Sequence, residues 1–174
     1  DVYGSNQRSK IQLKKKDKIL CAKYRKGHFE GVLDVVDRFL EVIKPKYLFL
    51  GEKDFQQYFF IKKYLKKQHS VSVKCCKTVR DKNLVALSTR NKLLSNNQYK
   101  IARLVANKLI LLKKDNPNEY KINLLKKFLT KNFKIKIEYL DYRSKENLLK
   151  NGIKKNKKIF IAYYLGKVRL IDNF

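Results

Sequence analysis

The stretch GEKDFQQ, residues 51 to 57, places a row of polar side chains directly after the apolar run YLFL, residues 47 to 50. A lysine adds a point charge beside a phosphate, and a glutamine offers both a donor and an acceptor to a small hydroxy acid. If a helix begins near Lys53, then Lys53 and Gln57 lie on one face of its first turn. The N–H groups of that turn favour an anion. We therefore predict a nucleotide and small-acid site at a strand mouth; the alternative is a solvated helix start.

A second polar stretch is LSTRN, residues 87 to 91. Ser88 and Thr89 supply hydroxyl groups, and the planar guanidinium of Arg90 can bind a polyphosphate through two parallel hydrogen bonds. The alternative is an ordinary polar loop in which the arginine makes a salt bridge.

A third stretch, RKGHFEG at residues 25 to 31, places His28 after Gly27 at an expected helix start. A metal role for His28 would need partner ligands, and His69 is the only other histidine. Capping or packing is the simpler interpretation, so the sequence predicts no metal-ligating residue.

These stretches sit on an alternating pattern of elements in the first half of the chain. Apolar residues of HFEGVLDVVDRFLEVI recur at helical spacing over 28–43, and Pro45 ends that helix. The continuous apolar run at 46–50 predicts a buried parallel strand. A helix over 53–66 and a strand over 71–76 complete a strand–helix–strand unit.

The second half of the chain has a different pattern. Two long helical segments are separated at Asn116-Pro117, and an alternating strand and a hairpin around Gly166 follow. We predict an α/β domain over residues 1–79 and a small α+β domain over residues 80–174. The expected elements of the second half are helices over 96–113 and 117–131, a strand over 133–142, a short helix over 144–150 capped by Ser144, and strands over 158–164 and 167–171.

Composition restricts the classes of protein. No apolar run reaches the roughly 20 residues that a membrane helix needs. Three cysteines, two of them adjacent at Cys75 and Cys76, form neither a disulfide framework nor a zinc spacing, so we expect a reducing, cytoplasmic setting. The net charge of +28 raises the alternative of a basic RNA-binding module. Because the lysines are spread along the whole length, and Lys, Asn and Ile are together what AT-rich codons encode, we do not expect a nucleic-acid partner.

Taken in order, the segments RKGHF, GEKDFQQ, TVR…LSTRN and RLIDN resemble the pantothenate synthetase (pantoate–β-alanine ligase) family. The family patterns are Arg-Pro-Gly-His-Phe, Gly-Glu-Lys-Asp-x-Gln-Gln, Asp-Gly-Leu-Ala-x-Ser-Ser-Arg-Asn and Arg-Leu-Ile-Asp-Asn. The resemblance covers nearly the whole chain, and its most specific match is GEKDFQQ.

The resemblance implies a ligase that joins pantoate to β-alanine with ATP and Mg²⁺, in pantothenate and coenzyme A biosynthesis. A pantoyl adenylate forms with release of pyrophosphate, and the amine of β-alanine then displaces AMP. The implied fold is a Rossmann-like nucleotidyltransferase domain, present here in part, followed by a smaller C-terminal lid domain. The implied assembly is a cytoplasmic homodimer.

The resemblance also assigns site residues by motif. It gives Lys53 and Arg90 catalytic roles in stabilising charge, and it gives Gln57 the role of holding pantoate. Val79 would touch ATP through its backbone. The residues that line the ATP site would be Gly51, Glu52, Lys53, Asp54, Val79, Leu87, Ser88, Thr89 and Arg90, the last four wrapping the phosphates from the lid side.

The sequence departs from the family pattern at three positions. Lys26 stands where the family has proline, Asn83 where it has aspartate, and Leu84 where it has glycine. If that glycine needs a positive φ, Leu84 must distort the loop before Ser88.

The family's His-x-Gly-His motif and a further pantoate-binding glutamine have no match here, because both precede residue 1 in the family's order. The chain also contains no methionine. We expect Asp1 to lie within a longer protein and the isolated chain to be inactive as a ligase. A related nucleotidyltransferase with another acid and amine is a further alternative, but the joint presence of Lys53 and Gln57 favours pantoate.

Overall fold

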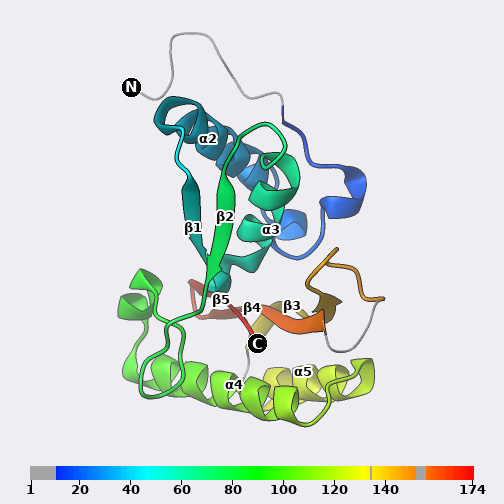
Figure 1. Cartoon of the computed structure of the whole chain (residues 1–174). Coiled ribbons are helices and arrows are strands. Elements are labelled where there is room, and N and C mark those ends of the chain that lie inside the picture. The colour runs from blue at the N-terminus through cyan, green and yellow to red at the C-terminus, as the bar shows by residue number, and fades with distance from the viewer. Residues whose placement is uncertain (1–10, 134, 152–155) are drawn as a thin grey trace. The chain divides into compact units, whose positions relative to one another are not determined.

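The computed structural model describes residues 11–133, 135–151 and 156–174. The chain divides into two compact units, Asp1–Lys77 (unit 1) and Thr78–Phe174 (unit 2) (Figure 1). The sequence predicts a domain boundary close by, near residue 80.

Unit 1 contains the predicted strand–helix–strand arrangement. Strands β1 and β2 run parallel, with Tyr47 opposite Ser72 and Gly51 opposite Cys76. Helix α3 lies between them in sequence and contacts both strands as well as α2. The elements of unit 1 are η1 (Lys15–Asp17), α1 (Cys21–Tyr24), α2 (His28–Ile43), β1 (Tyr47–Gly51), η2 (Glu52–Asp54), α3 (Phe55–Tyr64) and β2 (Ser72–Cys76).

Helix α2 has the bounds that its sequence predicts. It buries Phe29, Leu33 and Leu40, which recur at helical spacing on one face. Gly27 precedes the helix with φ +74, and Lys44 follows it in the left-handed conformation just before Pro45. Local backbone chemistry therefore fixes both ends of this helix.

Helix α3 begins later than the sequence predicts. A 3₁₀ turn spans Glu52–Asp54, and the α-helix starts only at Phe55. Asp54, at φ −94 and ψ 47, is not α-helical and separates the two segments. The expectation that Lys53 and Gln57 share the first turn of one α-helix is therefore wrong, because Lys53 belongs to the 3₁₀ turn.

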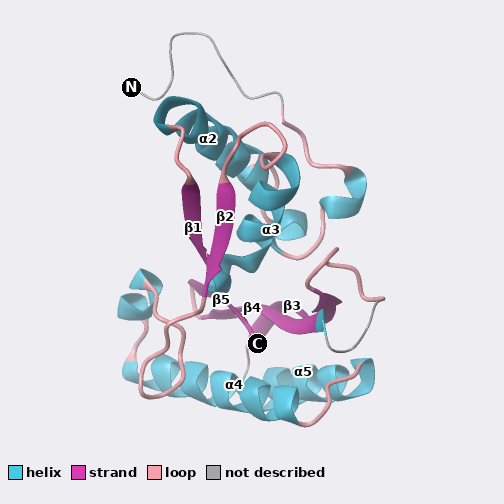
Figure 2. Ribbon diagram, in the orientation of Figure 1, coloured by secondary structure: helices cyan, strands magenta, loops and turns pink. Residues whose placement is uncertain are grey.

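Unit 2 is a three-stranded antiparallel sheet, ordered β3-β4-β5, with two long helices side by side along it (Figure 2). Gly166, at φ +59, turns the hairpin between β4 and β5. Ser95 and Gln98 form a capping box that begins α4. The elements are η3 (Thr89–Leu93), α4 (Asn96–Lys114), α5 (Glu119–Phe133), β3 (Lys136–Ser144), β4 (Lys157–Leu165) and β5 (Val168–Asn173).

The predicted short helix over 144–150 is wrong. Strand β3 continues to Ser144, whose hydroxyl accepts a hydrogen bond from the Glu146 backbone N–H at 3.1 Å. Leu148 then takes φ +58, a left-handed conformation that cannot continue a right-handed helix. The polar side chain predicted to cap a helix closes a turn instead.

Candidate functional site

The residues of GEKDFQQ lie at the carboxyl end of β1, as the sequence predicts. Gly51 is the last residue of the strand and is extended, at φ −70 and ψ 132. The Lys53 side chain is only 17% exposed, and its Nζ lies 3.8 Å from Asp54 Oδ2. Because the Lys53 side chain is sheltered and its ammonium group is near the Asp54 carboxylate, its positive charge lies close to the carboxyl end of β1.

The two glutamines of the stretch have different roles. Gln56 is buried and its Nε2 donates to the Ile19 carbonyl at 2.7 Å, which ties the segment before α1 to α3. Its Oε1 accepts no hydrogen bond within the described part of the chain. Gln57 is half-buried, one residue further around the helix, and is not committed to that contact. Of the two side chains, Gln57 is therefore the one that can turn to a ligand.

The start of α3 favours an anion. The Asp54 side chain does not cap the helix, so the N–H groups of its first turn keep their positive partial charge. Lys53 adds a full positive charge immediately before that turn. This arrangement suits a phosphate-bearing ligand better than a cation.

In unit 2, the predicted residues lie on one folded segment, 79–91. The Val79 carbonyl accepts from the Leu87 N–H at 3.0 Å, and Arg80 and Ala86 form an isolated antiparallel bridge. The chain reverses at Leu84, which takes φ +68. The segment is therefore a small hairpin whose two ends, at Val79 and Leu87, are hydrogen-bonded to each other.

The residues predicted to wrap the phosphates follow this hairpin. The Ser88 hydroxyl accepts from the Arg90 N–H at 3.3 Å, and the Asn91 side chain donates to the Ala86 carbonyl at 3.0 Å. Thr89 and Arg90 are exposed. Within the described residues no carboxylate forms an ion pair with Arg90, so the alternative of a salt-bridged loop arginine gains no support.

Asp81 fixes the turn of the hairpin. Its carboxylate accepts from the N–H groups of Asn83 at 2.8 Å and Val85 at 3.1 Å, and from the Tyr99 hydroxyl of α4. Burial opposes the charged form, but these hydrogen bonds outweigh it and hold the pKa of Asp81 below its ordinary value. The hydrogen bond to Asp81 in turn raises the pKa of Tyr99.

Leu84, which replaces the family's glycine, does not disrupt this turn. Its N–H donates to the Asp81 carbonyl at 2.9 Å, and the Asp81 N–H donates to the Val85 carbonyl at 3.0 Å. Leu84 itself takes the left-handed backbone, which costs a residue with a side chain roughly 1–2 kcal/mol. The expected distortion of the loop before Ser88 is therefore replaced by local strain at a single residue.

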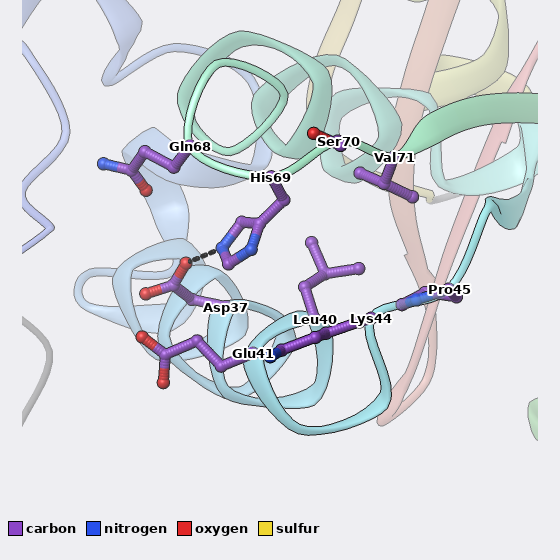
Figure 3. A pocket seen from close by; sticks show the side chains of 9 residues that line it. All are labelled: Asp37, Leu40, Glu41, Lys44, Pro45, Gln68, His69, Ser70 and Val71. Carbon is purple, nitrogen blue, oxygen red and sulfur yellow. Dashed lines mark hydrogen bonds and ion pairs between the residues drawn. The ribbon is translucent and has the colours of Figure 1, made fainter.

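A cavity of about 780 Å³ lies at the other end of the unit 1 sheet (Figure 3). Lys44 and Pro45, just before β1, and Val71, just before β2, contribute to its lining. His69 Nε2 lies 2.6 Å from Asp37 Oδ1, which ties the loop before β2 to helix α2. None of the predicted site residues lines this cavity.

His28 is the first residue of α2, and its ring centroid lies 5.1 Å from that of Phe29, consistent with packing. No group of three or more His, Cys, Asp or Glu side chains in the described ranges could hold a metal ion. Nor does any described helix have the length and apolar character to cross a membrane.

Two contacts that shape the 79–91 segment have no role in the sequence analysis, Arg80 with Asp172 and Asp81 with Tyr99. Arg80 Nη1 lies 2.7 Å from Asp172 Oδ2, although the two residues are 92 positions apart. Arg80 belongs to TVR and Asp172 to RLIDN, two of the stretches that carry the family resemblance. That coincidence is the one signal that could have linked them.

Comparison with known proteins gives one consistent result. The family model for pantoate-beta-alanine ligase matches residues 1–174. The bifunctional pantoate ligase/cytidylate kinase of Prochlorococcus marinus (strain MIT 9215) is 39% identical over 99% of this chain and 35% of its own length.

Two solved structures have similar folds. Pantothenate synthetase from Thermus thermophilus matches with a TM-score of 0.88 and 25% identity, over 99% of this chain and 65% of its own. Pantoate-beta-alanine ligase from Francisella tularensis, solved with beta-gamma ATP and beta-alanine, matches with a TM-score of 0.72 and 33% identity, over 98% of this chain and 59% of its own. The chain thus spans between about a third and two thirds of the length of these relatives.

Proposed function

Because the chain belongs to the pantoate–β-alanine ligase family, we propose that it is part of a pantothenate synthetase and carries residues that bind ATP and pantoate. The observation that carries the proposal is the placement of GEKDFQQ at the carboxyl end of a parallel strand, with a sheltered Lys53 just before an uncapped helix start. The fold is that of the family, a nucleotidyltransferase domain with a small C-terminal domain. The Francisella relative was solved with beta-gamma ATP and beta-alanine, which supports the ligand chemistry of the proposal.

The proposed reaction has two steps. A carboxylate oxygen of pantoate bonds to the α-phosphorus of ATP, and pyrophosphate leaves. The amine of β-alanine then attacks the acyl carbon, and the amide forms as AMP leaves. Both steps depend on positioning and on stabilising negative charge, because the protein forms no covalent bond itself.

The chain's own residues suit these tasks. Lys53 offers a cation to the phosphates from unit 1, and Arg90 offers an exposed guanidinium from unit 2. Gln57 can fix the pantoate hydroxyl or carboxylate with its donor and acceptor. We assign to the second domain, residues 80–174, the exclusion of water from the acyl adenylate.

Mg²⁺ has no protein-held site among the described residues, since they form no acidic or histidine cluster of three or more. ATP brings its own phosphate oxygens, which are the ligands that Mg²⁺ prefers. The residues present therefore fit ATP rather than a resident metal ion, and no step here is assigned to the metal.

We further propose that this chain does not catalyse the reaction alone. Parallel sheets are normally covered on both faces. In unit 1, however, Tyr47 and Phe49 point to one face of a two-stranded sheet and are 46% and 65% exposed. Two parallel strands with an open aromatic face are a partial α/β sheet. A cytoplasmic homodimer of the complete fold is the assembly that the family implies.

The test is pyrophosphate release that depends on both ATP and pantoate, measured for the full natural polypeptide and for the 174-residue chain. We expect activity only in the former. Lys53→Ala should lower kcat/KM by about a hundredfold, the typical effect of removing one charge-stabilising group. Gln57→Ala should raise KM for pantoate. The matched control is Lys62→Ala, which removes an exposed lysine of α3, the helix that carries Gln57. It should change neither kcat/KM nor the KM for pantoate.

Two outcomes would contradict the proposal. One is robust, pantoate-dependent pyrophosphate release by the isolated chain that Lys53→Ala abolishes, which would contradict its inactivity. The other is a full polypeptide without such activity that binds RNA with an affinity falling steeply with salt, which would favour the basic binding module.

A further inference from the structure

Arg80 is held by the last three residues of the chain. Its Nη1 and Nη2 donate to the two carboxylate oxygens of Asp172 at 2.7 and 2.8 Å, and Nη2 also donates to the Asn173 carbonyl at 3.1 Å. The guanidinium carbon lies 4.3 Å from the ring centroid of Phe174. A two-pronged ion pair, a carbonyl and a stacked ring together define both the position and the plane of the guanidinium.

Residues 172–174, which hold Arg80, are themselves fixed. Phe174 exchanges two backbone hydrogen bonds with Ile159, at 2.9 and 3.0 Å, and Asp172 lies opposite Ile161 in the β4–β5 ladder. Asn173 and Phe174 are 4% and 5% exposed. Residues 172–174 therefore form an anchor that belongs to the sheet.

Arg80 transmits this anchor to the 79–91 segment. Its Nη1 donates to the Leu84 carbonyl at 2.9 Å, so the side chain reaches the turn of the hairpin. Its backbone pairs with Ala86, and the flanking Val79 and Leu87 are bonded through carbonyl and N–H. One side chain thus ties both the base and the turn of the hairpin to β5.

The residues expected to meet ATP lie just beyond these contacts. Val79 is 66% exposed and Leu87 is 54% exposed, and Arg90 is exposed as well. Their side chains cannot be fixed by burial, so their placement depends on the backbone that carries them. A shift of about 1 Å in such a group can cost a hundredfold in rate.

We propose that Arg80, through its contacts with residues 172–174, is a positioning residue that holds Val79 and the Leu87–Arg90 stretch in the geometry that binds ATP. The inference rests on the proposed function of those residues. It gives Asp172 and Asn173, within the RLIDN stretch, a role in nucleotide binding that acts through Arg80.

The key variant is Arg80→Lys in the full natural polypeptide. A lysine keeps the charge but cannot bond both Asp172 oxygens, the Asn173 carbonyl and the Leu84 carbonyl at once. The matched control is Arg169→Lys. Arg169 pairs with Glu138 at 2.7 Å, with side chains 15% and 8% exposed, against 19% and 11% for Arg80 and Asp172. The control weakens a comparable ion pair in the same unit, between two residues that both lie outside the 79–91 segment.

Two readouts separate positioning from general stability. Hydrogen exchange at the Leu87 amide, which donates to the Val79 carbonyl, should accelerate about tenfold in Arg80→Lys and not in Arg169→Lys. KM for ATP should rise about tenfold in Arg80→Lys, with a smaller change in kcat and no change in KM for pantoate. A variant that is merely less stable loses active enzyme, which lowers the apparent kcat and leaves KM for ATP unchanged. Asp172→Asn should reproduce both effects.

Equal exchange at Leu87 in both lysine variants would overturn the inference, and so would an unchanged KM for ATP in Arg80→Lys. The proposed function fails in a different way. If the wild-type polypeptide neither binds ATP nor releases pyrophosphate, the ATP role of the hairpin is lost with it, whereas the exchange result still decides whether Arg80 fixes the segment.

Discussion

Leu84 should show the reverse of the usual order between glycine and alanine. Its φ of +68 puts a residue with a Cβ atom in the left-handed region, which glycine alone adopts without steric cost. Leu84→Ala keeps that strain, while Leu84→Gly removes it. The comparison of the two variants cancels the loss of the leucine side chain, which is 38% exposed.

The expected difference follows from two opposing contributions. The left-handed conformation costs a residue with a Cβ roughly 1–2 kcal/mol. Glycine avoids that cost but loses about 0.5–1 kcal/mol more conformational freedom than alanine on folding. Leu84→Gly should therefore be more stable than Leu84→Ala by about 0.75 kcal/mol, the difference between the midpoints of these two ranges.

Leu111 supplies the matched site. It lies within α4, is 59% exposed, and has an ordinary helical backbone. There glycine should be less stable than alanine by about 1 kcal/mol. The sign of the glycine–alanine difference is thus expected to reverse between two exposed leucines of the same unit.

The assay is urea unfolding of the four variants. Unfolding is monitored by hydrogen exchange at the β4 amides, so that the signal comes from unit 2. Each free energy of unfolding is read from the midpoint at a common slope. If Leu84→Ala proves as stable as Leu84→Gly while the Leu111 pair behaves as expected, residue 84 does not have a positive φ. The description of the hairpin would then be wrong.

Three further predictions concern single side chains. Burial and the hydrogen bond to Asp17 raise the pKa of Tyr64 to about 12, so its contribution to stability is complete below the ordinary value near 10 and is lost as the pH rises through about 12. Tyr64→Phe should reduce the alkaline loss of stability, measured as urea midpoints against pH, and parallel curves for variant and wild type would refute this. Tyr99→Phe removes a donor to a carboxylate whose pKa is depressed and should cost about 1–2 kcal/mol near neutral pH. Since the contribution of a depressed carboxylate is lost as the pH falls through its folded pKa, the gap to wild type should narrow in acid, and a constant gap would contradict the assignment. Leu109→Ala, at a fully buried position of α4, should cost about 3 kcal/mol by urea unfolding; a loss below about 1 kcal/mol would show that the site is not a packed core.

The sequence predicts elements well where local chemistry determines them. Helix α2 is predictable to the residue because an apolar stripe lies between Gly27 and Pro45. The prediction of a 144–150 helix fails because the left-handed backbone of Leu148 has no sequence signature in a leucine. The start of α3 is misplaced by two residues for a similar reason, since the backbone of Asp54 decides it and most residue types can begin a helix there.

For the candidate site, residue types predict which groups face a ligand, but they do not predict which contacts hold those groups in place. Lys53 and Gln57 stand out because polar residues at the carboxyl end of a parallel strand indicate a ligand site. The contact between Arg80 and Asp172 spans 92 positions and follows no period, so only a folded chain shows it. The roles of Lys53, Gln57 and Arg90 stay predictions until ATP binding is measured.

The left-handed Leu84, at a position where the resemblance predicts glycine, shows why supporting contacts matter as much as the motif. A left-handed leucine is tolerated when its neighbours specify the turn more strongly than its side chain opposes it. Asp81 does so by accepting two backbone N–H groups of the turn, and Arg80 does so by donating to the Leu84 carbonyl. The segment before Ser88 therefore requires a backbone conformation and not a particular residue. Removing either support should expose the strain at Leu84, so in Arg80→Lys the substitution Leu84→Gly should restore part of the lost protection at Leu87, whereas it should add little in a chain with Arg80 intact.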